Sequence, residues 1–152
     1  MNSIELKTYL YDACVQFVDA KLKTIEHTMQ SNQEALDSES KSSAGDKHET
    51  GRAMLQLEME KAGQQLQEVE KMKLILEKIQ SEFVTAVGSL GAVVKTTSGN
   101  YYLGVSVGKI TVGPEDYFVI SPSSPIGKLL LGKQEKDRFL FQGRTIEVKE
   151  IY

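Results

Sequence analysis

Two long stretches without helix breakers constrain the fold of this chain most strongly. The first, residues 3–38, contains neither proline nor glycine. Its apolar residues recur at the spacing that places side chains on one face of an amphipathic α-helix. We therefore expect a first long helix whose final third is polar. The apolar positions are Leu6, Leu10, Ala13, Phe17, Ala20 or Lys21, Ile25, Met29 and Leu36.

The second stretch has the clearer pattern, a near-heptad series of apolar residues with Gln, Glu and Lys on the other faces. The series comprises Leu55, Met59, Ala62, Leu66, Val69, Met72, Leu76, Ile79 and Phe83. Gly63 interrupts it, and we take this glycine as a mark of close approach between two helices. Residues 1–87 are thus expected to form an antiparallel coiled-coil hairpin, roughly 50 Å long at a rise of ~1.5 Å per residue.

The period of the apolar pattern changes after Gly88-Ser89-Leu90-Gly91, which we interpret as a domain boundary. Residues 88–152 are expected to form a small α+β domain with an antiparallel sheet and one helix. Hairpin turns are expected at Ser98-Gly99-Asn100 and at Gly143-Arg144. The expected strands are Ala92–Thr96, Tyr101–Val107, Lys109–Val112, Tyr117–Ser121, Arg138–Gln142 and Thr145–Ile151.

The single helix of this second domain has a recognisable start. Ser124 is expected to cap it and Pro125 to occupy its first position, where a missing N–H costs nothing. The helix then runs through Ile126, Leu129 and Leu130 to Gly132.

Composition excludes several classes of protein. A net charge of −3 does not suit a general nucleic-acid binder. Residues 1–87 carry 15 acidic and 10 basic side chains, whereas residues 88–152 carry 6 and 8. Cys14 is the only cysteine, and its apolar neighbours indicate a buried structural thiol. No signal peptide and no apolar run of ~20 residues is visible, so we expect a cytoplasmic protein without membrane partners.

The segment between the two long helical patterns, residues 42–50, carries a candidate site. Gly45 favours a turn, Asp46 stands where a helix N-cap is wanted, and Glu49 follows at a spacing close to a capping box. One interpretation is that both acids only cap a helix. The other is that the end of a long helical hairpin presents them to a partner.

Two motifs resemble those of the bacterial Gre transcript-cleavage factors. Gly45-Asp46-Lys47-His48-Glu49, followed by Thr50, is similar to the hairpin-tip motif of that family. The segment Ser124-Pro125-Ile126-Gly127-Lys128-Leu129-Leu130-Leu131-Gly132-Lys133, with Asp137 after it, resembles the family's C-terminal signature. The order of motifs and the expected architecture match over essentially the whole chain.

The resemblance implies a function and a fold. Gre factors dock on RNA polymerase through an FKBP-like C-terminal domain and insert their coiled coil into the secondary channel. Their tip acids help to hold the second catalytic Mg²⁺, so that the polymerase cleaves the 3′ end of backtracked RNA. Here those acids would be Asp46 and Glu49, and the docking residues Ser124, Pro125, Lys128, Gly132 and Lys133. The implied protein is a monomer that binds Mg²⁺ only within the polymerase and is not itself an enzyme.

The coordination chemistry of Mg²⁺ is consistent with this role of Asp46 and Glu49. Two acids at positions i and i+3 point to roughly the same side of a helix, and Mg²⁺ takes few protein carboxylates. They make half of a two-metal site, which a partner must complete.

Other residues near the tip and in the second motif have more than one interpretation. His48 invites a metal or acid–base role, but His27 is the only other histidine and no cluster is possible, so an exposed tip residue is the favoured interpretation. Lys47 and Arg52 screen the acids, contact phosphate, or form a solvated face. Lys128 and Lys133 serve docking or solubility.

The alternative functions are a secondary-channel binder that does not promote cleavage or inhibits transcription, a coiled-coil adaptor, and a prolyl isomerase. The last needs an aromatic-lined apolar pocket, for which the candidates are Tyr101, Tyr102, Tyr117, Phe118, Phe139 and Phe141.

Overall fold

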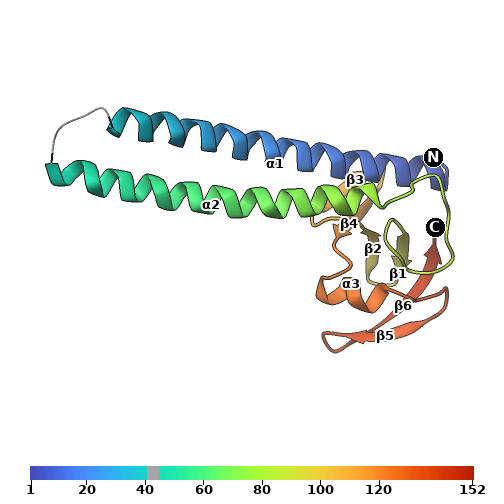
Figure 1. Cartoon of the computed structure of the whole chain (residues 1–152). Helices are drawn as coiled ribbons and strands as arrows, with labels where there is room; N and C mark the ends of the chain where they lie inside the picture. Colours follow the sequence, from blue (N-terminus) through green and yellow to red (C-terminus); the bar gives the residue numbers. More distant parts are fainter. Residues whose placement is uncertain (41–44) are drawn as a thin grey trace. The chain divides into compact units, whose positions relative to one another are not determined.

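The computed structural model describes the backbone of residues 1–40 and 45–152, and side chains outside 39–48 (Figure 1). Two helices, α1 (Ser3–Ser40) and α2 (Gly45–Glu77), precede a six-stranded sheet and a short helix. The later elements are β1 (Val93–Thr96), β2 (Gly99–Leu103), β3 (Gly108–Val112), β4 (Glu115–Ile120), α3 (Pro125–Leu130), β5 (Arg138–Phe141) and β6 (Arg144–Ile151). The α+β class expected from the sequence is confirmed.

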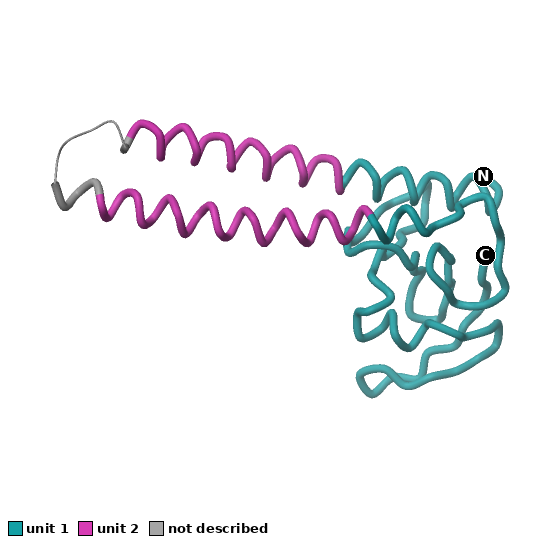
Figure 2. Tube along the Cα trace, in the orientation of Figure 1, with its two compact units in different colours: residues 1–17, 74–152 teal, residues 18–73 magenta. Residues whose placement is uncertain are grey.

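The chain divides into two compact units (Figure 2). We call Val18–Lys73 the helix-pair unit, and Met1–Phe17 together with Leu74–Tyr152 the sheet unit. Each long helix therefore contributes residues to both units.

The helix-pair unit consists of one segment of α1 and one of α2, drawn in Figure 1 running in opposite directions. Among its described residues few apolar side chains are buried, and all fall on the predicted apolar positions or beside them: Val18, Ile25, Ala62 and Val69. One polar residue, Asn32, is also buried, with 7% of its surface exposed. The amphipathic pattern thus identified the buried stripe of α2, whereas on α1 Val18 rather than Phe17 is buried and both Ala20 and Lys21 are exposed.

Two details of the second helix differ from expectation. A Cβ built on Gly63 meets no atom within 4 Å, so this glycine does not mark a close approach between helices. Phe83 lies beyond the end of α2 and is 64% exposed. The helix ends earlier because its last turn tightens: the N–H groups of Lys78 and Ile79 bond to carbonyls three residues back, at 3.1 Å.

The sheet has the order β3-β4-β2-β1-β6-β5 and is mixed, where the sequence predicted an antiparallel one. The pair β2–β4 is parallel, with Tyr101 opposite Phe118, and the other pairs are antiparallel. The chain reverses twice between β2 and β4, and β4 rather than β3 lies beside β2. Two reversals restore the original direction, which makes this one pairing parallel.

The two expected hairpin turns are each displaced by one residue. Thr96 pairs with Gly99, so Thr97 and Ser98 form the first turn and Gly99 already belongs to β2. Phe141 pairs with Arg144, which places the last turn at Gln142-Gly143. Both residues of that turn have positive φ, 50° and 77°, as two-residue hairpins favour.

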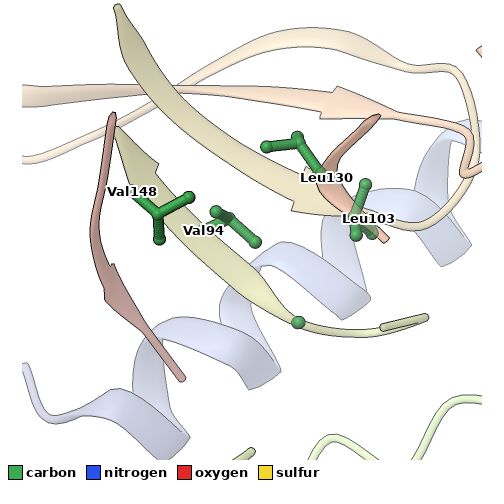
Figure 3. Close-up of a cluster of buried hydrophobic side chains, with 5 residues drawn as sticks. Val94, Leu103, Leu130 and Val148 are labelled. Carbon is green, nitrogen blue, oxygen red and sulfur yellow. The ribbon is translucent and has the colours of Figure 1, made fainter. Parts of the chain in front are cut away.

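One buried apolar cluster of the sheet unit combines side chains of α3 and of the sheet. Figure 3 shows Val94, Leu103, Leu130 and Val148 pointing toward one another; together with Ala92 they are fully buried. Partly buried side chains extend this cluster: Tyr101, Ile120, Ile126, Phe139 and Ile151.

Cys14, on α1, is buried in the sheet unit, as the sequence predicted. Burial raises the pKa of its thiol to about 11, against a smaller lowering effect of a backbone hydrogen bond at Val105. The thiolate is therefore scarce at neutral pH.

None of the helices in the described ranges has a stretch long and apolar enough to cross a membrane.

Candidate functional site

The candidate tip residues lie at the start of α2. The helix begins at Gly45, so Asp46 and Glu49 both belong to its first turns. Glu49, Thr50 and Arg52 are exposed. The side chains of Gly45's neighbours Asp46, Lys47 and His48 lie outside the described residues, and so does the proposed capping geometry.

This placement satisfies one geometric requirement of the predicted site. Residues at i and i+3 of a helix lie on the same side, and the helix N-terminus favours negative charge. Among the residues that the structure describes, no group of three or more His, Cys, Asp or Glu side chains is arranged to hold a metal ion. Asp46 and Glu49 by themselves offer only part of a coordination shell.

The start of the second motif forms the predicted helix cap. Ser124 has extended backbone angles, and its Oγ accepts a hydrogen bond from the N–H of Gly127 at 3.1 Å. The same hydroxyl donates to the carbonyl of Ser121 at 2.7 Å, and Pro125 begins the helix. A Cβ on Gly127 would overlap the carbonyl oxygen of Ser121, which explains the glycine. The predicted cap is confirmed.

The end of the motif fastens α3 to the segment before β1. Gly132 has a φ of 78°, a left-handed conformation that favours glycine. Its N–H donates to the carbonyl of Gly88, while the N–H of Gly88 donates to the carbonyl of Lys133, both at 2.8 Å. We call this pair of bonds the glycine clasp. A Cβ on Gly88 would overlap the carbonyl oxygen of Leu130, so the clasp requires glycine there as well.

The charged residues of the motif differ in their surroundings. Lys128 is exposed on α3. The Lys133 ammonium lies 5.7 Å from the centre of the Phe139 ring, a cation–π distance. Asp137 accepts a hydrogen bond from the N–H of Gln134 at 2.7 Å and thereby closes the turn before β5. Much of the second motif is thus explained by backbone geometry, and its exposed members include Pro125, Lys128 and Leu131.

Sequence reasoning missed Lys7, which is 3% exposed in the sheet unit. Its Nζ donates a hydrogen bond to the carbonyl oxygen of Phe83, and burial lowers the pKa of its ammonium. One signal was present, because Lys7 lies three residues before Leu10 on the buried stripe of α1. Its partner, 76 residues away along the chain, was not predictable.

Sequence reasoning also missed a polar cluster around Lys95. This lysine on β1 pairs with Glu115 on β4 and lies near the rings of Tyr117 and Tyr152. Its residues come from distant parts of the chain, and no sequence motif joins them.

The aromatic residues considered for an isomerase pocket are divided between core and surface. Tyr102 and Tyr117 are buried, whereas Phe118 is 40% exposed. Tyr101 lies 6.0 Å from Phe118, ring centre to ring centre. A hollow of about 450 Å³ opens beside Tyr101, lined also by Ser98, Phe141, Gln142, Arg144 and Ile146.

In comparisons with known proteins, neither a family model nor a curated protein matches this chain.

Proposed function

We propose that this chain is a secondary-channel factor of bacterial RNA polymerase that stimulates Mg²⁺-dependent cleavage of backtracked RNA. In this proposal the helix-pair unit acts as an antiparallel coiled-coil hairpin and the sheet unit as an FKBP-like docking domain. The observation that supports it most is local: the Gly45-Asp46-Lys47-His48-Glu49 motif lies at the start of α2, at the junction of two long helices, with Glu49 exposed.

The proposed chemistry needs a partner. Asp46 and Glu49 supply oxygen ligands to a second Mg²⁺, directly or through its waters, and the polymerase supplies the first metal and the RNA 3′ end. The protein therefore assists catalysis without being an enzyme. Lys47, His48, Thr50 and Arg52 are accessory residues near RNA phosphates or the polymerase active centre. The protein acts in the cytoplasm as a monomer.

The docking role is assigned to the second motif. Ser124, Gly132 and the backbone of Lys133 fix the shape of α3 and its ends. Pro125 and Lys128 are exposed on this fixed frame and are proposed to contact the polymerase directly.

The decisive experiment measures 3′-end cleavage of RNA in backtracked complexes of the cognate polymerase. Asp46→Asn/Glu49→Gln is compared with the wild type, and Glu58→Gln/Glu60→Gln serves as a matched control because both glutamates are exposed further along α2. We expect cleavage with the wild type and the control and its loss, about 100-fold or more, in the tip variant. Equal cleavage by all three proteins would refute a role for the tip acids.

Binding separates the alternatives within this class. Competition of the wild type with a known channel ligand, without cleavage, would identify a non-cleaving or inhibitory channel factor. If the wild type does not bind polymerase at all, Asp46 and Glu49 are helix caps only. The result would then favour the coiled-coil adaptor function.

A charge reversal tests the docking surface. Lys128→Glu is expected to weaken polymerase binding about tenfold, because it replaces an attraction by a repulsion at an interface. Lys149→Glu, at an exposed position on β6, is the control. Equal affinities for the two variants would remove Lys128 from the interface.

Prolyl isomerisation has one observation in its favour, the hollow beside Tyr101 and Phe141. A protease-coupled assay on a proline peptide tests it, with Phe141→Ala as the variant. If the wild type shows no isomerase activity, this candidate function is eliminated.

A further inference from the structure

The sheet unit contains a second hollow, which opens beside the polar cluster around Lys95 and includes no residue of the tip or of the α3 motif. It has a volume of about 390 Å³, within the range of small-molecule sites. Its walls come from the start of α1, the β3–β4 hairpin, β1 and the last residue, all of which belong to the sheet unit. The apolar part of the lining includes Leu6, Val112 and Pro114. The polar part includes Asn2, Ser3, Lys95 and Glu115.

One positive and one negative group lie side by side in this hollow. The Lys95 Nζ is 3.1 Å from Glu115 Oε2, and the two side chains are 21% and 46% exposed. The hydroxyl of Tyr117 donates to the same Oε2 at 2.7 Å. The Lys95 ammonium also lies 5.9 Å and 5.7 Å from the ring centres of Tyr117 and Tyr152. Rings and carboxylate together hold the ammonium in place.

Both charges persist at neutral pH. Burial disfavours the Lys95 ammonium, but the hydrogen bond to Glu115 and the nearby acidic groups outweigh it, so the pKa of Lys95 is raised to about 12. The pKa of Glu115 is lowered, first by the hydrogen bond from Tyr117 and then by Lys95. The pKa of Tyr117 is raised to about 12, chiefly by burial and by its bond to Glu115. The cluster is therefore a fixed dipole across the physiological range.

This dipole has unused bonding capacity, and both of its residues line the hollow. An ammonium carries several N–H donors, and Glu115 takes one of those on Lys95. Within the described part of the chain, both hydrogen bonds to the Glu115 carboxylate go to Oε2, and Oε1 receives none. A free anion would be attracted by Lys95 but repelled by Glu115. A free cation would be attracted by Glu115 but repelled by Lys95. A ligand that carries both charges on neighbouring atoms avoids both conflicts.

We propose that this hollow is a binding site for a small zwitterion, an α-amino acid with an apolar side chain. Its carboxylate bonds to the remaining N–H donors of Lys95, and its ammonium bonds to Oε1 of Glu115. Its side chain lies against Leu6, Val112 and Pro114. The site is independent of the polymerase proposal, because none of its residues belongs to the tip or to the α3 motif.

The test is an amide-shift titration of the ¹⁵N-labelled full-length protein with four related probes. L-Leucine carries both charges, N-acetyl-leucine only the negative one, leucine amide only the positive one, and N-acetyl-leucine amide neither. We expect saturable shifts at the residues lining the hollow with leucine, with a Kd on the order of 1 mM, and at least ~10-fold weaker binding of the other three. Equal binding of any singly charged or neutral probe overturns the proposal, as does the absence of shifts with leucine.

Two variants test the residues, and the chain supplies a matched control. Lys95→Met and Glu115→Gln each remove one charge, and Gln retains an oxygen for the Tyr117 hydroxyl. Lys109→Met and Asp116→Asn remove the exposed pair on β3 and β4, whose charged atoms are 3.9 Å apart and outside the hollow. We expect about tenfold weaker leucine binding in the first two variants and no change in the controls. The same spectra report whether each variant is folded, and unchanged affinity in a folded Glu115→Gln protein contradicts the proposal.

Discussion

The two units of this protein achieve burial in different ways. Among the described residues of the helix-pair unit, few side chains are buried, in a single stripe along each helix, and one of them is the polar Asn32. In the sheet unit, a cluster centred on Val94, Leu103 and Val148 is closed on one side by α3, and the glycine clasp fixes the backbone around it. A helix with one buried stripe tolerates substitution on most of its surface. The glycine clasp tolerates almost no substitution of its glycines. The predicted chemistry at Asp46 and Glu49 thus belongs to the unit in which fewer described side chains are buried.

The positions of the aromatic residues allow the two units to be followed separately. All six tyrosines and all five phenylalanines lie within residues 1–17 and 74–152. Near-UV circular dichroism therefore reports the sheet unit, and the helical signal in the far-UV reports mainly α1 and α2. Urea unfolding monitored by both probes is the readout for the stability predictions below.

The largest expected effect is in the sheet unit. Gly88→Ala places a Cβ on the carbonyl oxygen of Leu130, so the clasp must open. We expect a loss of about 3 kcal/mol in the free energy of unfolding, seen first in the near-UV signal. A loss below ~0.5 kcal/mol would show that the clasp adjusts and that the contrast between the units is weaker than described.

Asn32→Leu should have a smaller effect of opposite sign. The Asn32 Nδ2 is buried without a hydrogen-bond partner among the described residues. Replacing it by an apolar group removes an unpaired donor, and we expect a gain of about 1–2 kcal/mol in the far-UV transition. Destabilisation instead would mean that Asn32 makes a polar contact that stabilises the unit.

Gly63→Ala sharpens the comparison with Gly88. Added methyl groups meet open space at Gly63 and backbone at Gly88. Because alanine favours helix more than glycine, we expect Gly63→Ala to stabilise by up to ~1 kcal/mol. Replacing glycine by alanine is then expected to change the free energy of unfolding in opposite directions at the two positions. A change in the same direction at both would contradict the packing described for Gly63.

The smallest effect concerns the pH dependence contributed by Lys7. Its pKa is lowered in the folded state, so the unfolded chain binds more protons there as the pH approaches the usual lysine range. This group therefore makes stability rise with pH in the alkaline range, up to the unfolded-state pKa. We expect the wild-type minus Lys7→Met difference in unfolding free energy to become more favourable as the pH rises through that range. A flat difference would indicate that the Lys7 ammonium is not desolvated.

Local features of the sequence predicted local structure well. Apolar spacing located α1 and the buried stripe of α2, and Ser124 with Pro125 located the start of α3. Each of these depends on neighbours within a few residues. The parallel β2–β4 pairing depends instead on which strand lies beside β2, which no turn residue specifies.

The candidate sites likewise contain features that neighbouring residues predict and contacts that depend on distant residues. The position of Asp46 and Glu49 at a helix start was readable from the adjacent Gly45. Lys7 and Phe83 meet across 76 residues, and Lys95 and Glu115 across 20. A periodic pattern assigns a lysine to a face but contains no information on its partner, so both clusters were missed.

The burial of Cys14 has a practical consequence for studying this molecule. Because burial raises the pKa of the Cys14 thiol to about 11 and covers its surface, we expect this thiol to react slowly in the folded protein. A cysteine introduced at exposed Glu49 or Lys128 would then be the only reactive thiol among the described residues. A fluorophore, spin label or cleavage reagent attached there reports from one known position, with no need to remove the native cysteine.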